Sequence, residues 1–174
     1  DPVTGSLSGN IEFGVESRIF VNKEGNRFVN EGGRRDEMTK ALFAQPDNLM
    51  WIVMDSDCYP TGEEKNNFNE SVNSLIAEGR AVKGDSLEDL AKKIDVPYEN
   101  LKAALDEYNK HCETKEEDQF GRTLYGPAID NAPFYAAARV PTVHHTMGGA
   151  HINEYAQVLN ESGQIIPGLY AAGE

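Results

Sequence analysis

The sequence predicts an α+β fold, in which helices and short strands mix without a regular alternation. Three observations lead to this prediction. The apolar run over residues 49–54 is typical of a strand that is buried on both faces of a sheet. Residues 18–22 and 27–31 are β-branched and aromatic runs around a turn with Gly25, which indicates a hairpin. Apolar stripes with helical spacing follow these strands, and no internal repeat is present.

Four helices are expected in the middle of the chain. Pro46 ends the first and Gly79 ends the second. Ser86, with two acidic residues after it, is typical of an N-cap, and Pro97 opens the longest helix. The expected helices cover residues 36–45, 68–77, 86–94 and 97–112.

Further short strands are expected toward the end of the chain. Residues 134–143 are rich in aromatic and small apolar residues, with Pro141 near the end of the run. Asn160 to Gly163 is a turn signal between two apolar segments. The short strands are expected at residues 152–153, 156–159 and 169–171.

Composition limits the classes of function. The chain has 174 residues and a formal net charge of −13, which argues against binding to nucleic acid and to an anionic membrane surface. No apolar run approaches the length of a membrane span. Cys58 and Cys112 lack the spacing of a zinc site or of a disulfide framework. An anionic small molecule remains a possible substrate, because local arginines and histidines can outweigh the global charge.

Arg34 and Arg35, directly before Asp36, are the first candidates for a functional site. Two guanidinium groups at the start of a helix could bind carboxylates, because the planar fork of guanidinium matches a carboxylate. The alternative is a surface salt bridge to a neighbouring acid, which contributes little to stability.

The stretch His144-His145-Thr146-Met147-Gly148-Gly149 is the second candidate. Imidazole binds anions and transfers protons near neutral pH, and paired glycines let the backbone approach a ligand closely. A metal site would need His151 as a third ligand, and the glycines in between make a preformed site improbable. Small residues at the end of a strand, as at Gly173-Glu174, can admit a cofactor.

Several stretches, taken in order, closely resemble the flavoprotein fumarate reductase family. This family includes flavocytochrome c fumarate reductases, urocanate reductases and the flavoprotein subunits of succinate dehydrogenase. The resemblance extends from about residue 18 to the end of the chain. The matching stretches are 21–31 (VNKEGNRFVNE), Arg35-Asp36, 132–136 (APFYA), 144–149 (HHTMGG) and 165–174 (IIPGLYAAGE).

The resemblance implies a two-domain flavoenzyme in which a mobile capping domain closes over the substrate beside an FAD-binding domain. Residues 1–145 correspond to the capping domain, and residues 146–174 to part of the FAD-binding domain, to which the chain returns. The chain has no G-x-G-x-x-G stretch, so we expect that dinucleotide-binding motif upstream, in a longer protein. An additional segment that contacts FAD and carries an arginine is expected downstream.

The resemblance also assigns roles to individual residues. Arg35 takes the position of the family's proton donor. His145 takes that of a substrate-carboxylate ligand, and His144 would replace it if the register shifts by one residue. The residues placed near FAD are Thr146, Met147, Gly148, Gly149, Gly173 and Glu174.

The implied reaction is the reduction of the C=C bond of an unsaturated carboxylate. Reduced flavin delivers a hydride to one alkene carbon, and Arg35 protonates the adjacent carbon. Free guanidinium has a pKa above about 12, but a developing carbanion is basic enough to accept its proton. The implied partners are the substrate, the FAD domain of the same full-length chain, and an electron donor, which is a protein, a flavin or a haem module.

One stretch departs from the family pattern and keeps other substrates open. Fumarate reductases carry a Thr-Glu pair before the hairpin and a histidine further back. Residues 10–17 here read NIEFGVES, and no histidine precedes them. Urocanate or another acrylate-type acid is therefore an alternative to fumarate, and a dehydrogenase working in the reverse direction is another.

A hypothesis from a different functional class is that the chain is a stand-alone, non-catalytic ligand-binding module. The flanking sequence separates the two classes, because a chain limited to these 174 residues has no room for an FAD domain. On the enzyme reading, the chain alone is expected to be inactive and to bind FAD weakly or not at all, since most FAD contacts would lie elsewhere.

Overall fold

The computed structural model describes residues 1–11, 16–143 and 148–173. The chain forms two compact units, Asp1–Pro141 and Thr142–Glu174. The predicted boundary at residue 145 between a capping domain and an FAD-binding segment stays a prediction.

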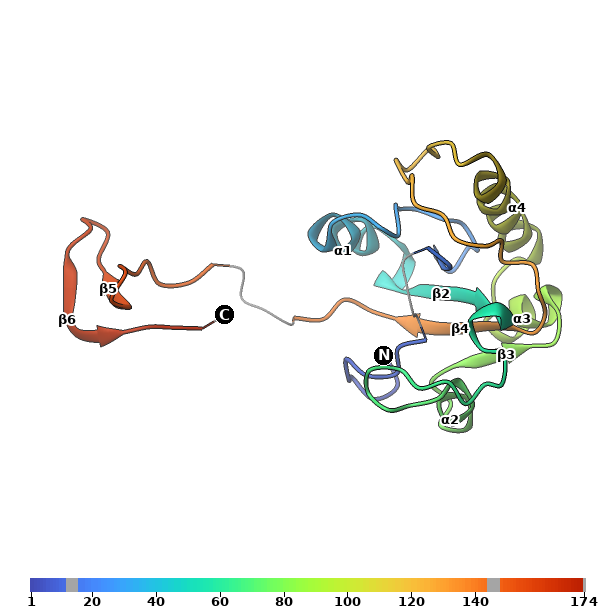
Figure 1. Cartoon of the computed structure of the whole chain (residues 1–174), viewed down its shortest axis with the longest axis horizontal. Coiled ribbons are helices and arrows are strands. Elements are labelled where there is room, and N and C mark those ends of the chain that lie inside the picture. Colours follow the sequence, from blue (N-terminus) through green and yellow to red (C-terminus); the bar gives the residue numbers. More distant parts are fainter. Residues whose placement is uncertain (12–15, 144–147, 174) are drawn as a thin grey trace. The chain divides into compact units, whose positions relative to one another are not determined.

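A four-stranded sheet forms the centre of the first unit, and neighbouring strands run antiparallel (Figure 1). The strand order is β1-β2-β4-β3. The longest pairing joins β2 to β4, from Met50 opposite Arg139 to Asp55 opposite Phe134. The strands are β1 (Ile19–Val21), β2 (Met50–Asp55), β3 (Val82–Gly84) and β4 (Phe134–Arg139).

Among the described residues, four α-helices accompany this sheet, and two short 3₁₀ turns flank β2. The longest helix, α4, buries Leu101, Ala104, Leu105 and Tyr108, which are the four residues of the predicted apolar stripe. The helices are α1 (Arg35–Phe43), α2 (Val72–Ala77), α3 (Leu87–Lys93) and α4 (Tyr98–Thr114), and the turns are Pro46–Asn48 and Ser56–Cys58.

Both faces of the sheet are covered, as the apolar run at β2 predicted. Val53 packs in one core cluster with residues of α3 and α4. Ile52 and Met54, which point to the opposite face, pack in a second cluster with residues of α2. Figure 1 shows α4 and α2 on opposite sides of the sheet. The first unit is therefore a sheet between two helical layers.

Local capping explains where two helices begin. Ser86 accepts a hydrogen bond from the backbone N–H of Asp89, which confirms the predicted N-cap of α3. The predicted start of the second helix at residue 68 is wrong. Ser71 and Ser74 form a reciprocal capping box, in which each hydroxyl accepts the other's backbone N–H, so α2 begins at Val72.

The predicted hairpin is only half present. β1 forms, but residues 27–31 do not form a strand, and Arg27 makes a single isolated bridge to Val21. The reason lies in the side chain of Glu31, which is fully buried and accepts the backbone N–H of Phe20. A carboxylate thus takes the place of a partner strand at that position of β1. The structure also shows β3, which was not predicted.

The second unit contains an antiparallel pair, β5 (Gln157–Leu159) and β6 (Ile165–Tyr170). The predicted turn is present, because the Asn160 side chain accepts the backbone N–H groups of Ser162 and Gln164 at 3.0 and 2.9 Å. β6 begins earlier than the predicted strand at residue 169, and every residue of it is exposed within this chain. Across the described ranges, no helix has both the length and the apolar character needed to cross a membrane.

Candidate functional site

Arg35 is the first residue of α1, and its side chain is exposed. The preceding residue, Arg34, is the N-cap, and its side chain makes no capping hydrogen bond. The first turn of α1 therefore presents a cationic side chain at the positive end of the helix dipole. Both features favour an anion at this position.

Arg34 and Arg35 have different surroundings. The Arg34 guanidinium forms two bonds to the Asp36 carboxylate, at 3.1 Å from Nε and 2.8 Å from Nη2, and both side chains are largely exposed. This pairing raises the pKa of Arg34 and lowers the pKa of Asp36. Within the described ranges, the Arg35 guanidinium makes no hydrogen bond or ion pair. The surface salt bridge that was one alternative for this motif thus involves Arg34 and leaves Arg35 available.

The second candidate stretch lies mostly outside the described residues. His144, His145, Thr146 and Met147 are outside the described residues, and so is Glu174. The structure therefore does not describe two of the three ligands of the alternative metal site, His144 and His145, whereas His151 is described. In the part of the chain that the structure describes, no group of three or more His, Cys, Asp or Glu side chains is arranged to hold a metal ion.

Three glycines predicted to lie near FAD are described. Gly148, Gly149 and Gly173 have φ angles of 120°, 154° and 102°, and residues that carry a side chain rarely adopt such angles. A Cβ atom added to any of them would meet no atom within 4 Å. The predicted contact of these glycines with the flavin stays a prediction.

Four charged side chains, Arg27, Glu31, Asp118 and Arg122, form a buried group that we call the Glu31 cluster. Glu31 accepts bonds from Arg27 Nε and Nη2 at 2.8 and 2.9 Å and from Arg122 Nη1 at 2.8 Å. Arg27 Nη2 also reaches Asp118 at 2.7 Å. All four side chains are at most 1% exposed. Such charges are retained in a core only when they are paired.

Arg122 connects the Glu31 cluster to distant parts of the chain. Its guanidinium donates to the backbone carbonyls of Glu16, Arg18 and Leu124 at 3.0, 2.8 and 2.9 Å. The same group lies over the rings of Tyr108 and Tyr125, at 4.7 and 5.3 Å from their centroids. Arg122 therefore joins the segment before β1, the loop before α1, and its own loop.

The Arg18 guanidinium borders the same region. It donates to the backbone carbonyl of Glu31 at 3.0 Å and lies 4.9 Å from the centre of the Phe20 ring. Burial lowers the pKa of Arg18 to about 10, with Glu31 acting against this change and Arg122 adding to it. No local sequence pattern points to the Glu31 cluster or to Arg18, because the bonded residues lie up to about a hundred positions apart in the chain.

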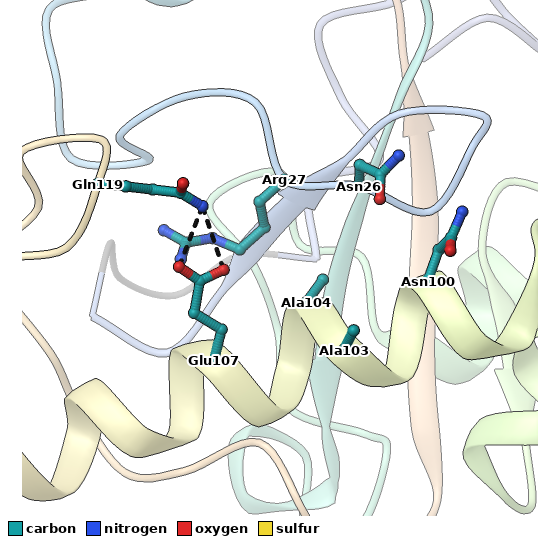
Figure 2. Close-up of a pocket in the computed structure, with 7 residues that line it drawn as sticks. All are labelled: Asn26, Arg27, Asn100, Ala103, Ala104, Glu107 and Gln119. Carbon is teal, nitrogen blue, oxygen red and sulfur yellow. Dashed lines mark hydrogen bonds between the residues drawn. The ribbon is translucent and has the colours of Figure 1, made fainter.

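A polar pocket of about 140 Å³ lies beside Arg27, on the surface of α4 (Figure 2). Gln119 donates to both carboxylate oxygens of Glu107, at 3.0 and 3.3 Å, across part of this pocket. None of the predicted site residues lines it. Its residues are Asn26, Arg27, Asn100, Ala103, Ala104, Glu107 and Gln119.

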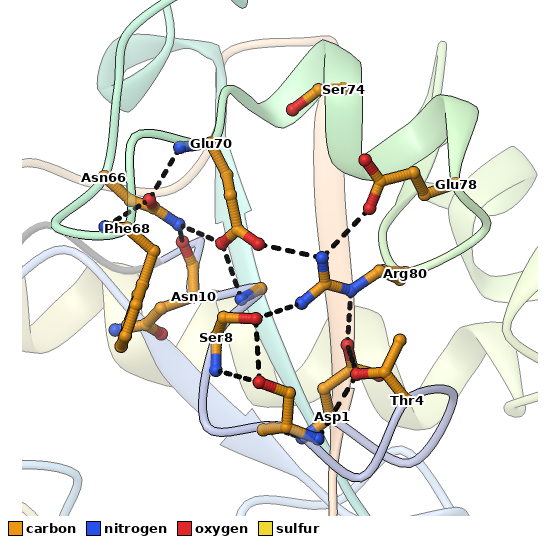
Figure 3. Close-up of polar contacts among 12 residues, drawn as sticks. Asp1, Thr4, Ser8, Asn10, Asn66, Phe68, Glu70, Ser74, Glu78 and Arg80 are labelled. Atoms are coloured by element: carbon orange, nitrogen blue, oxygen red, sulfur yellow. Dashed lines mark hydrogen bonds and ion pairs between the residues drawn. The ribbon is translucent and has the colours of Figure 1, made fainter.

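A second charged group, centred on Arg80, holds residues 1–11 against the region of α2 (Figure 3). Arg80 pairs with Asp1, and with Glu70 and Glu78 at 2.8 and 2.9 Å. Glu70 also accepts the backbone N–H of Gly9 at 2.7 Å. These contacts fix the segment that leads to the divergent stretch at residues 10–17.

We expect Glu70 to stabilise the fold in a pH-dependent manner. Burial alone would raise the pKa of Glu70, but bonds from Asn66, Gly9 and Arg80 lower it from 4.5 to about 2. A carboxyl group with a depressed pKa gives its full stabilisation above the unfolded value and loses it as the pH falls through the folded value. Glu70→Gln should therefore lower the free energy of unfolding at neutral pH, on the order of 1–2 kcal/mol after solvent screening, and by much less at about pH 2.

Urea denaturation of the chain at both pH values measures this effect. Glu78→Gln is the matched control, because Glu78 pairs with the same arginine through a side chain that is 53% exposed. It should change the unfolding free energy little at either pH. An equal loss for Glu70→Gln at both pH values contradicts the prediction.

The comparisons with known proteins agree with the resemblance seen in the sequence. The family model described as "FAD binding domain" matches residues 7–174, and the chain belongs to this family of flavoprotein oxidoreductases. The family uses FAD as its cofactor.

Two curated relatives align with the whole chain. It is 39% identical over 176 residues to NADH:acrylate oxidoreductase of Vibrio harveyi and 33% identical over 177 residues to urocanate reductase of Eggerthella lenta. The chain covers 17% and 29% of these two proteins, respectively.

The chain is also similar to a solved structure, the open conformation of a flavocytochrome c3 fumarate reductase. The TM-score is 0.69 at 34% identity, with 97% of this chain and 28% of the other chain covered. The chain therefore spans less than a third of the length of each of these relatives.

Proposed function

We propose that this chain is part of an FAD-dependent oxidoreductase that reduces the C=C bond of an unsaturated carboxylate. Residues 1–145 form its capping domain, and residues 146–174 return to its FAD-binding domain. Membership of the family and the similarity to a flavocytochrome c3 fumarate reductase support this assignment. The exposed strand β6 is consistent with it, because a strand with apolar side chains such as Ile165 and Leu169 is ordinarily covered in a complete domain.

The observation that carries the proposal is the environment of Arg35. The chain belongs to a family of flavoprotein oxidoreductases, and the Arg35 guanidinium lies in the exposed first turn of α1. Its neighbour Arg34 is paired with Asp36, and the guanidinium of Arg35 has no partner among the described residues. An arginine in this position can contact an anionic substrate and transfer a proton to it.

The reaction divides between the cofactor and residues of this chain. FAD, when bound and reduced, supplies the hydride for one alkene carbon. Arg35 donates a proton to the adjacent carbon, which becomes basic enough to accept it only as negative charge develops there. His145, or His144 in the alternative register, binds the substrate carboxylate and favours the enolate-like charge.

Other residues of the chain would hold the cofactor. Gly148, Gly149 and Gly173 provide backbone that a flat ring can approach, and Thr146, Met147 and Glu174 complete the proposed contacts. Closure of the capping domain excludes water, which protects both the hydride and the developing charge. An electron donor, which is a protein, a flavin or a haem module, reduces the cofactor between turnovers.

The substrate is proposed at the level of its chemical class. Fumarate, acrylate and urocanate share a carboxylate conjugated to a C=C bond, and relatives of this chain are named after each of them. Residues 10–17 lack the family's Thr-Glu pair, which favours acids other than fumarate. Acrylate and urocanate are therefore the alternatives to test beside it.

A full-length protein that contains this chain provides the test. We expect it to oxidise reduced methyl viologen when one of these three acids is added, and to carry stoichiometric FAD. The 174-residue chain alone should bind FAD weakly and show no turnover. A full-length protein that holds FAD but reduces none of the acids overturns the proposal. Stoichiometric FAD on the isolated chain contradicts the expectation that most FAD contacts lie elsewhere in the full-length protein.

A further inference from the structure

We infer that Glu31 is a positioning residue for Arg35, acting through its buried ion pair with Arg122. This inference rests on the proposed function only for the role of Arg35. The geometry is independent of that role, because it concerns how the loop between Glu31 and α1 is held.

The first turn of α1 is not fixed by packing of its own. Arg35, Asp36 and Glu37 are all exposed, and the only buried residue of the helix is Leu42, in its last turn. Met38 packs only partly against the core. The position of Arg35 therefore depends on the residues that precede the helix.

Those residues are anchored at two neighbouring points. The Glu31 carboxylate binds the Phe20 backbone, Arg27 and Arg122 in the core. Beside it, the Asn30 side chain donates to the backbone carbonyl of Gly121 at 2.9 Å. Together, these two anchors connect the loop before α1 to β1, through Glu31, and to the loop that carries Arg122, through both residues.

The connection from these anchors to Arg35 is short. It consists of Gly32, Gly33 and Arg34. The N–H of Gly32 binds the Asn30 side chain at 2.9 Å, and the N–H of Gly33 binds the Asn30 carbonyl at 3.0 Å. The anchors thus set where the connection begins and in which direction it enters the helix. Loss of the Glu31 ion pair would leave two glycines to determine the position of Arg35.

Glu31→Gln in the full-length protein tests the inference, because it removes the charge and keeps the size of the side chain. We expect a loss of about tenfold or more in kcat, with KM and FAD content nearly unchanged, since small displacements of a reacting group are costly. Amide hydrogen exchange over residues 32–37 should become about tenfold faster, while the amides of β2 and β4 remain protected.

Asp55→Asn is the matched control. Asp55 is also a buried carboxylate, 2% exposed, and it accepts the backbone N–H groups of Asp57, Asp130 and Asn131. None of these three hydrogen bonds involves the loop before α1. Its replacement should leave exchange over residues 32–37 and kcat within about twofold of the parent protein, although both variants lose global stability.

Asn30→Ala is a second variant that keeps every buried charge. It removes the bonds to Gly121 and Gly32 and should give a smaller change in the same direction, about threefold in exchange and in kcat. Exchange over residues 32–37 at the parent rate in Glu31→Gln overturns the inference, whatever the activity. If the parent protein reduces no enoate, the proposed function fails, and the exchange measurement still decides the role of Glu31.

Discussion

Replacing Arg35 with alanine in the full-length protein is expected to lower the rate of alkene reduction by roughly 10²–10⁴-fold, the usual contribution of a positioned general acid. The side chain is exposed and makes no bond to a described residue, so its removal should leave the fold and FAD binding intact. Oxidation of reduced viologen with saturating enoate measures the rate, and the flavin absorbance measures the FAD content. Arg35→Lys should be nearly as slow, because ammonium lacks the planar fork.

Arg34→Ala provides the control for this prediction. Arg34 is adjacent, carries the same charge and is also exposed, but its guanidinium is paired with Asp36. We expect its loss to change the rate by no more than about twofold. Equal losses for Arg34→Ala and Arg35→Ala would show that the two arginines act through general electrostatics. Near-normal turnover in Arg35→Ala would remove its role as the proton donor.

The second large effect is expected for Arg122→Met, which should lower the free energy of unfolding by about 3–5 kcal/mol. Methionine can fill much of the volume, but Glu31 then keeps only one of its two arginine partners. The carbonyls of Glu16 and Arg18 also lose a donor inside the protein. Urea denaturation of the chain, followed by the fluorescence of its single tryptophan, Trp51, measures the loss.

Two further variants separate charge from geometry. Arg122→Lys keeps the charge, but its side chain cannot reach all of these partners. The urea concentration at the midpoint of its unfolding should therefore lie between the values for the parent and for Arg122→Met. Lys102→Met removes an exposed cation of α4 that pairs with Asp106, and the midpoint should not move. A parent-like midpoint for Arg122→Met would mean that the Glu31 cluster contributes no net stability, as some buried ion pairs do not.

The parts of the fold that local patterns encode could be predicted from the sequence. The apolar run at β2 is buried on both sides because the sheet carries a helical layer on each face. The stripe of α4 and the cap at Ser86 formed as expected, since both depend on residues only a few positions apart. The position of Arg35 at the start of a helix follows from the same local signals.

The Glu31 cluster could not be predicted, because its pattern imitates another structure. Residues 27–31 contain an aromatic and a β-branched residue after a turn with Gly25, which is typical of the second strand of a hairpin. In the structure these two side chains bind each other in the core, together with Arg122, 91 residues further along the chain from Glu31. No local pattern reports a partner at that distance. The three-residue strand β3 was missed because it is too short to show a period.

The strand order affects how the sheet can form while the chain is being synthesised. β4 is the last strand of the first unit along the chain, yet it lies inside the sheet, between β2 and β3. Until residues 134–139 have been synthesised, β3 has no neighbour in the sheet and β2 has only β1. A nascent chain that ends before residue 134 therefore leaves unpaired the edge of β2 and the edge of β3 that β4 covers in the folded sheet.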